Sequence, residues 1–226
     1  MTNPIAYPAL ELSTKPDGSS SWTFETDSPD APGHPSTCQI TPGTPTVPMK
    51  AVFHPGVRPP KTPWSNAYIL HRNQFTNSTD WSYNSTVMYP TQQDIDNSQC
   101  YEEDRQDNPG SMIFNWGWQF RFGEGGFIWN RSANNGNGDW EGPFLTPAAV
   151  AFTPGVPKQI VALHSRDTAH LTYLGVAIDG AFMPLNITFP AVPKVQAPYV
   201  NNAWQLDSKG QGAPITCFVR CNLVGF

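Results

Sequence analysis

The sequence predicts an all-β protein, an antiparallel β-sandwich of jelly-roll type with a Pro-rich N-terminal arm. Within residues 111–122, every second position is bulky and apolar, namely Met112, Phe114, Trp116, Trp118, Phe120 and Phe122. Successive side chains of a strand lie on opposite faces, so this period of two predicts a half-buried strand. The 24 prolines and 18 glycines disfavour long helices and favour short strands joined by turns. Such strands at fairly regular spacing are typical of sandwiches and jelly rolls.

The remaining strands are expected where short apolar or alternating runs lie between turn residues. Asp179-Gly180 is a strong signal for a type I′ hairpin turn. A short helix is expected only in the acidic stretch 94–107. The expected strands are residues 21–26, 49–53, 66–72, 80–89, 111–122, 126–129, 158–164, 170–178, 181–183, 185–189 and 214–224.

The chain of 226 residues is expected to form one domain. Residues 1–64 hold 13 of the 24 prolines, and this composition predicts an arm with the first strands, packing on the core. No internal repeat of fixed period is present, which disfavours a propeller or a β-trefoil.

The charge balance bears on the class of partner. The formal net charge is −5, and the 13 Lys and Arg residues are scattered. Nucleic-acid binding and binding to an anionic membrane both depend on clustered positive charge, so neither partner is expected. The N-terminal residues lack the charged and apolar regions of a secretion leader. We therefore expect a cytoplasmic location, with a secreted mature form left open.

The cysteines and the glycosylation sequons are expected to carry no function. Cys38, Cys100, Cys217 and Cys221 permit up to two disulfides, whose pairing stays open. Cys217 and Cys221 fall on one face of the last strand, which predicts buried thiols; a zinc site would need two further ligands. In a chain without a leader, the four Asn-x-Ser/Thr sites are expected to be chance matches, at Asn77, Asn84, Asn130 and Asn186.

The expected ligand site lies around the Asn/Gly-rich stretch 134–139, which two tryptophans flank. Indole rings stack on sugars and on planar aromatic ligands, and amide and carboxylate groups orient a ligand by hydrogen bonds. Trp116 and Trp118 are instead expected in the core. The predicted ligand-binding residues are Trp129, Trp140, Asn135, Asn137, Asp139 and Glu141.

The acidic stretch only partly resembles a calcium loop. Asp94, Asp96 and Glu102 are spaced like ligands, but Gln99 replaces the required glycine and Arg105 the final glutamate. A solvated acidic surface is the preferred interpretation.

No motif identifies a reaction, so we expect no catalytic residue and no metal site. The run from His164 to Asp167 contains a histidine, a serine and an aspartate, but catalytic triads form in space and not by adjacency. Glu124 and Glu141 are the candidates for an alternative, a carboxylate-dependent hydrolase.

In its general character the chain resembles the leaderless β-proteins of mushroom fruiting bodies, which include lectins and the pink chromoprotein of oyster mushrooms. The likeness rests on the start at residues 1–4, the Pro-rich arm, the aromatic strand 114–122 and the mass of 24.9 kDa. It implies a fungal, non-enzymatic protein that holds a small ligand, and it assigns no site residue.

The main functional prediction is therefore a protein that binds a planar aromatic or pigment-like ligand in an aromatic-lined pocket. The first alternative is a glycan-binding lectin and the second is the hydrolase. The cofactor is not fixed by the sequence; a small aromatic chromophore and a divalent cation are the two considered.

Overall fold

The computed structural model is a two-layer antiparallel β-sandwich, which confirms the predicted fold class. It describes residues 10–11, 23–25, 36–43, 46–56, 65–73, 80–108, 112–121, 127–131, 140–145, 151–190, 192–193, 199–208 and 213–225. Side chains are described only at 36–43, 46–56, 82, 84–98, 151–190 and 213–220. In these parts of the chain, no helix is long and apolar enough to cross a membrane.

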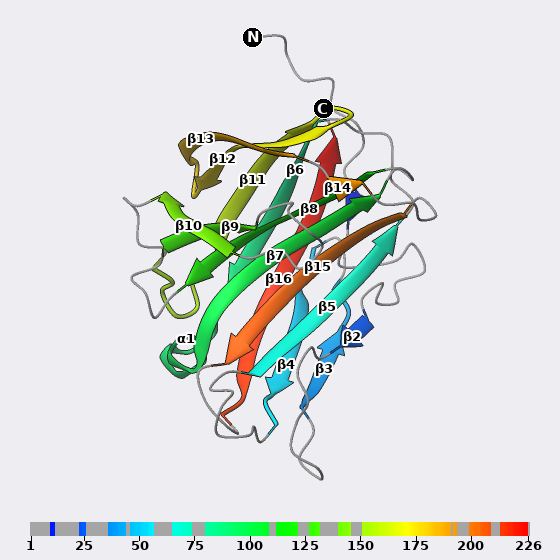
Figure 1. Ribbon diagram of the computed structural model, residues 1–226. Coiled ribbons are helices and arrows are strands. Elements are labelled where there is room, and N and C mark those ends of the chain that lie inside the picture. The colour runs from blue at the N-terminus through cyan, green and yellow to red at the C-terminus, as the bar shows by residue number, and fades with distance from the viewer. Residues whose placement is uncertain are drawn as a thin grey trace.

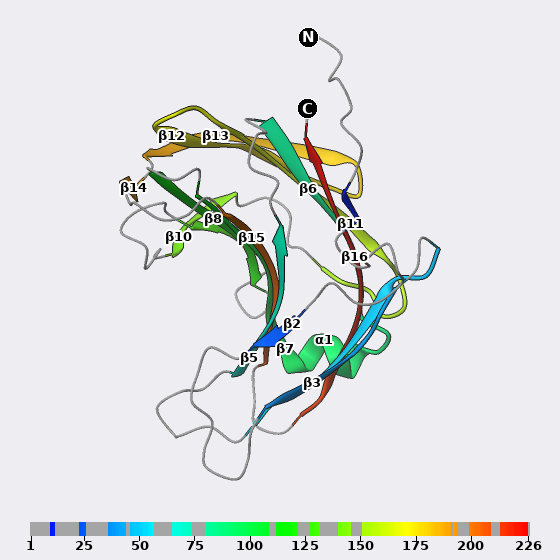
Figure 2. The same ribbon diagram turned by 90° about the vertical axis from the view of Figure 1, so that its right-hand side faces the viewer.

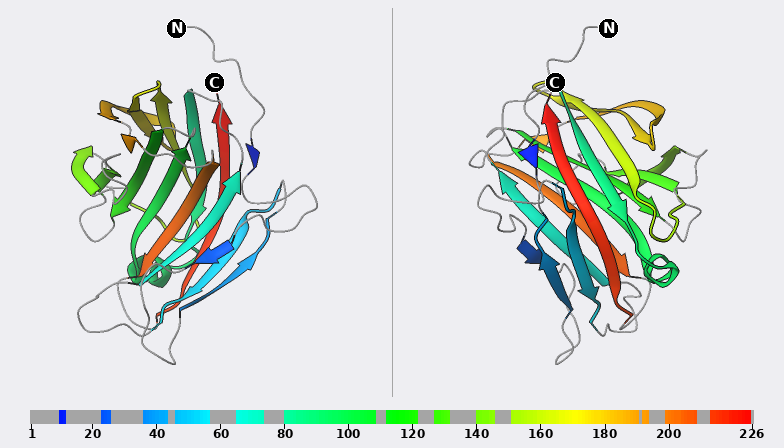
Figure 3. Two further views of the ribbon diagram at one scale, coloured as in Figure 1. Left: turned by 45° about the vertical axis from the view of Figure 1, so that its right-hand side comes forward. Right: turned by 180° about the vertical axis from the view of Figure 1, so that it is seen from behind.

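One layer, here called the back sheet, has the strand order β13-β12-β11-β6-β16-β4-β3, and β1 pairs with β16. Figure 3 (right) shows β16 and β6 in the middle of this layer. Its strands are β1 (Leu10–Glu11), β3 (Thr37–Thr41), β4 (Met49–His54), β6 (Asp80–Met88), β11 (Lys158–Arg166), β12 (His170–Ile178), β13 (Ala181–Pro190) and β16 (Ile215–Gly225).

The other layer, the front sheet, has the order β10-β9-β8-β7-β15-β5-β2, and β14 pairs with β8 (Figure 1). Figure 2 shows this sheet strongly curved, with its concave side turned away from the back sheet. Its strands are β2 (Thr23–Glu25), β5 (Ser65–Asn73), β7 (Ser98–Asn108), β8 (Met112–Arg121), β9 (Phe127–Arg131), β10 (Trp140–Leu145), β14 (Val192–Pro193) and β15 (Tyr199–Ser208).

The back sheet supplies a core through strict alternation along its strands. In β4 and β16 the buried residues alternate with half-exposed ones. Register pairing aligns these buried residues across strands, as in the pairs of Phe53 with Ile215 and of Ala51 with Cys217. Because cross-strand partners share a sheet face, the buried face of the back sheet is largely apolar, with Ser85 and His164 as buried polar exceptions.

An aromatic chain extends this core across β11, β12 and β13. Tyr173 is fully buried, and its ring meets those of His164 and Phe189 edge-on, with centroid distances of 5.4 and 5.6 Å. Edge-to-face pairs at this distance add to the stabilisation from area burial.

The predicted type I′ turn is present between β12 and β13. Asp179 and Gly180 have φ values of +49° and +84°, the two positive values that this turn requires. The Asp179 carboxylate accepts a hydrogen bond from the backbone N–H of Gln159 at 2.9 Å. It also forms an ion pair with the Lys158 ammonium group at 2.9 Å.

Gly175 lies at a register shift in β12, where β13 passes close to its backbone. A Cβ at this position would lie 2.5 Å from the Met183 carbonyl oxygen and 2.6 Å from the Phe182 ring. We expect Gly175→Ala to lower the free energy of unfolding by about 2–3 kcal/mol, because backbone must shift to admit the methyl group.

Gly155→Ala is the matched control for Gly175→Ala. Like Gly175, whose φ is +156°, Gly155 has a positive φ, of +71°, but an added Cβ at Gly155 meets nothing within 4 Å. Its expected cost is backbone strain of about 1 kcal/mol. Urea unfolding of both variants checks the difference, and equal losses would contradict the steric account.

The only helix in the described part of the chain is α1 (Gln92–Asn97), at one end of the sandwich between the sheets (Figure 2). A short helix was expected in residues 94–107, but most of that stretch is strand β7. The sequence also gave no prediction for β3, β10 or β15. β7 and β15 are rich in polar residues, so they lack the apolar runs on which the strand predictions depended.

Candidate functional site

Three of the six predicted ligand-binding residues lie at one edge of the front sheet, where β9 and β10 form an antiparallel pair. Trp129 lies in β9, and Trp140 and Glu141 begin β10. Trp140 is the register partner of Arg131. The chain between these two residues contains the Asn/Gly-rich segment. Asn135, Asn137 and Asp139 lie outside the described residues.

The backbone register divides this set between the two faces of the sheet. Trp140 pairs with Arg131, which is two residues from Trp129, so both tryptophans occupy the same face. Glu141 pairs with Asn130 and therefore occupies the opposite face. The two tryptophans can act together at one surface, whereas Glu141 belongs to the other.

The face that holds the two tryptophans also carries a row of register partners that crosses the sheet. Here it is called the cross-sheet row, and it consists of Trp129 (β9), Gln119 (β8), Glu102 (β7), Gln205 (β15) and Tyr68 (β5). Neighbouring strands are about 4.8 Å apart, so the row spans the width of several sugar units. Amide, carboxylate, phenol and indole groups are the ones that bind sugars.

The opposite face of the front sheet holds the aromatic positions of β8. Trp118 lies in a row with Glu103 and Trp204. Trp116 lies two residues along, in a row with Arg105, Asn202 and His71. The sequence prediction that Trp116 and Trp118 belong to the core concerns their side chains, which lie outside the described set.

The interpretation of the acidic stretch as a solvated surface is wrong for Asp94. This side chain is 8% exposed. Its Oδ1 accepts the backbone N–H of Thr216 at 2.7 Å, and its Oδ2 accepts the N–H of Thr91 at 3.1 Å and also the Thr91 hydroxyl. Asp94 therefore caps α1 and joins it to β16. The spacing that resembled a calcium loop belongs to a helix followed by a strand.

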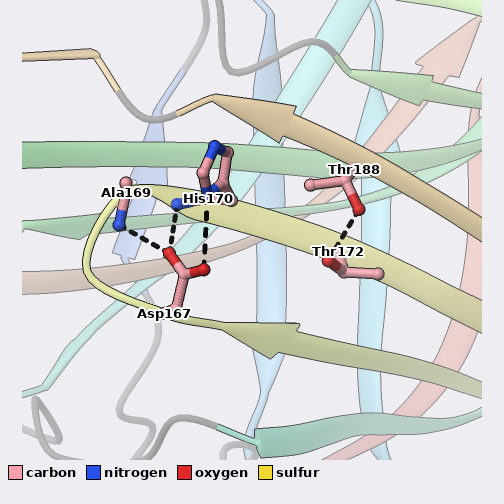
Figure 4. A network of polar contacts seen from close by, with 5 residues as sticks. All are labelled: Asp167, Ala169, His170, Thr172 and Thr188. Carbon is pink, nitrogen blue, oxygen red and sulfur yellow. Dashed lines mark hydrogen bonds and ion pairs between the residues drawn. The ribbon is translucent and has the colours of Figure 1, made fainter.

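The run from His164 to Asp167 does not assemble as a catalytic group. His164 is fully buried in the back sheet, whereas Asp167 lies exposed in the turn between β11 and β12. Asp167 accepts the N–H groups of Ala169 and His170 at 2.6 Å, and its Oδ2 lies 3.2 Å from His170 Nδ1 (Figure 4). These bonds, that of Ala169 first, lower the pKa of Asp167. The aspartate therefore closes a turn and pairs with a different histidine.

The prediction of buried cysteine thiols is confirmed for Cys217, which is fully buried. Burial raises the pKa of Cys217 well above its usual value and that of Cys38 to about 11. Both thiols are free. Because metals bind thiolates, these values disfavour metal binding at either sulfur. Within the described residues, no three His, Cys, Asp or Glu side chains are grouped as metal ligands.

The sequence identified Trp129 and Trp140 but missed the other members of the cross-sheet row. Gln119 and Tyr68 lie in strands that were predicted, so their place on a face was available from alternation. Their partners Glu102 and Gln205 lie in β7 and β15, which were not predicted. The alignment of five strands that are distant in sequence cannot be predicted from the local sequence pattern of any one of them.

Comparison with known proteins gives matches of structure. No family model matches the sequence, and no curated protein matches it. Alginate lyase vAL-1 from a Chlorella virus aligns over 99% of this chain and all of its own, with a TM-score of 0.52 and 13% identity. Endo-β-1,4-glucuronan lyase from the fungus Trichoderma reesei aligns over 96% of this chain and 94% of its own, with a TM-score of 0.52 and 11% identity.

Peanut lectin also aligns, over 96% of this chain and 97% of its own, with a TM-score of 0.46 and 10% identity. At these identities the matches bear on fold alone, so the likeness to mushroom proteins stays a prediction. The chain has the jelly-roll, concanavalin-like β-sandwich fold that it shares with the two lyases.

Proposed function

We propose that the protein binds a glycan on the front sheet and does not turn it over. The observation that carries the proposal is the cross-sheet row, in which residue types suited to sugar binding occur on five neighbouring strands. The fold adds support, because both lyases that share it act, by their names, on polysaccharides. The glycan reading is thus better supported than the pigment reading that the sequence favoured.

The face that would receive the glycan follows from the composition of β8. Asn115, Gly117, Gln119 and Arg121 alternate with the aromatic positions, and they share their face with the cross-sheet row. In β8 one face is apolar and the other polar, and an antiparallel sheet packs its more apolar face inward. We infer that the polar face is the concave one in Figure 2 and that the glycan lies there.

Truncation of the tryptophans tests this proposal. We expect Trp140→Ala to weaken glycan binding about 5- to 30-fold, the equivalent of a stacking contact worth about 1–2 kcal/mol. Trp129→Ala should act similarly, and both should leave the circular dichroism spectrum unchanged. Binding is measured by titration calorimetry with soluble oligosaccharides.

Trp118→Ala is the matched control, because Trp118 lies on the opposite face of the same sheet. We expect it to lower the free energy of unfolding by about 3–5 kcal/mol through loss of a core aromatic. If instead Trp140→Ala unfolds the chain while Trp118→Ala only abolishes binding, the assignment of faces is reversed.

A planar aromatic ligand is the second candidate. It is favoured by Trp116, Trp118 and Trp204, which share the face of the front sheet that holds the aromatic positions of β8; Glu103 lies between Trp118 and Trp204 in the register. Tryptophan and tyrosine absorb only in the ultraviolet, so a visible band in protein from its natural source would support this candidate. Native and denatured masses that are equal, with no such band, would remove it.

A further inference from the structure

Two of the four Asn-x-Ser/Thr sequences have described side chains, and their environments differ sharply. They are Asn84-Ser85-Thr86 in β6 and Asn186-Ile187-Thr188 in β13. A glycan attached at a sequon is bulky and hydrated, so a folded protein accommodates it only where the asparagine faces solvent. The structure therefore discriminates between sites that the sequence treats as equal.

Asn84 is half-exposed and lies in a central strand of the back sheet. β6 lies between β11 and β16, and the register partners of Asn84 are Val161 and Asn222. Its Oδ1 atom is buried, and the following Ser85 is only 2% exposed. The amide of Asn84 is therefore less accessible than that of an exposed asparagine on an edge strand.

Asn186 lies in the opposite situation. It is exposed and has a φ of +55°, a conformation that asparagine adopts more readily than most residues. Ile187 pairs with Tyr173, and Pro184 pairs with Gly175. Two residues of β13, one of them Asn186, therefore lie opposite the single residue 174 of β12, which makes a β-bulge. In the described back sheet β13 is the edge strand, with β12 as its one neighbour in the strand order.

The third residue of this sequon is also accessible. Thr188 is exposed, and its hydroxyl lies 2.9 Å from the hydroxyl of Thr172 on β12 (Figure 4). Ile187, between the two, is not a proline, which is the residue that prevents modification. The complete recognition sequence thus lies on an exposed sheet edge.

We propose that Asn186 is an N-glycosylation site of the secreted form, the location that the sequence analysis left open as an alternative. The donor is an oligosaccharide linked to a lipid through pyrophosphate. The Asn186 amide nitrogen forms the bond to C1 of the first sugar and gives up one proton to a base of the transferase. The bond from C1 to the pyrophosphate oxygen breaks, and the lipid pyrophosphate leaves with the bonding electrons. No oxidation or reduction takes place.

A glycan at Asn186 also agrees with how this edge is built. An open strand edge invites pairing with another chain, and proteins protect such edges with prolines, bulges and bulky polar groups. β13 already contains Pro184, Pro190 and the bulge. Phe182, 53% exposed, lies on the same strand. The glycan would shield this edge and the apolar side chain near it.

The test is secretion of the full chain from a eukaryotic host behind a cleavable leader. Glycopeptides of the secreted protein are mapped by mass spectrometry after enzymatic deglycosylation in heavy-oxygen water. We expect modification at Asn186 and none at Asn84. Asn186→Gln and Thr188→Ala should remove the modification, whereas Thr188→Ser and Asn84→Gln should retain it.

Each outcome decides the proposal. A secreted, folded protein whose Asn186 peptide is unmodified overturns it, and a modified Asn186 peptide supports it. Mapping on the unaltered chain gives this answer even if a variant fails to fold. Occupancy of Asn77 and Asn130 is read from their own peptides and does not enter the result.

Discussion

Asp94→Ala is expected to lower the free energy of unfolding by about 2–3 kcal/mol, because two part-buried backbone donors lose their acceptor. Those donors are the N–H groups of Thr91, which precedes α1, and Thr216, which belongs to β16. The helix loses its N-terminal capping box as well, which typically contributes about 1 kcal/mol. Asn97 makes a second link to β16 through the Pro214 carbonyl at 3.1 Å, so α1 should stay docked but loosened.

Two measurements distinguish the capping role of Asp94 from a role in binding calcium. Asp96 is exposed and accepts only the side-chain amide of Gln92, at 2.9 Å, so Asp96→Ala should cost no more than about 0.5 kcal/mol. Calcium should leave the melting temperature of the unaltered chain unchanged. Calcium-dependent stabilisation that Asp94→Ala abolishes would contradict the capping role and support the metal site.

Polyuronates are expected to bind at least tenfold more weakly than uncharged polysaccharides of similar length. The strands of the front sheet contain seven carboxylates and four arginines, the carboxylates being Glu25, Glu102, Glu103, Asp104, Asp107, Glu141 and Asp207. Four of these belong to β7, near the middle of the sheet, and alternation puts two on each face. Glu102 and Asp104 share the face of the cross-sheet row, so an anionic polymer on that face meets carboxylates.

The size of the effect follows from Coulomb's law. Two like charges 4 Å apart repel by about 1 kcal/mol in water and by more near a protein surface, so two such contacts exceed a tenfold loss. Replacing Glu102 by glutamine and Asp104 by asparagine removes two charges from the face of the cross-sheet row and should improve polyuronate binding. Asp96→Asn removes a charge from α1 and is the matched control, with no expected effect.

The two lyases that share this fold act, by their names, on alginate and glucuronan, which makes the polyuronate comparison a test of likeness beyond fold. Strong polyuronate binding that rises as salt is lowered would contradict the electrostatic argument. Shortened polymer chains after incubation would contradict the non-enzymatic proposal. If they still appeared after loss of both Glu124 and Glu141, the hydrolase alternative would also be excluded.

The sequence predicted the fold class because alternation is a local property. The spans predicted for β12 and β8 agree with the structure to within one residue at each end, since apolar periodicity and turn residues mark their limits. The turn at Asp179-Gly180 was predicted for the same reason. At each of these places the residues of the element itself determine its structure.

Predictions failed where distant contacts decide the outcome. β15 pairs with β5 and β7, strands more than 90 residues earlier, and its alternation of Asn and Gln with Trp and Leu was not distinctive alone. Asp94 resembles a surface acid until Thr216, 122 residues later, supplies its donor. The candidate site shows the same contrast between local and distant information. Trp129 and Trp140 were predicted because they flank one segment, whereas Gln205 shares their face only through strand pairing that the sequence does not reveal locally.

The measurement that tests the central claim most directly is calorimetric titration of the full chain with a panel of uncharged oligosaccharides. The account predicts saturable binding of at least one member, lost in the Trp129→Ala/Trp140→Ala double variant while the circular dichroism spectrum and melting temperature are kept. Absence of saturable binding across the panel, or binding that survives loss of both tryptophans in a folded chain, would contradict it.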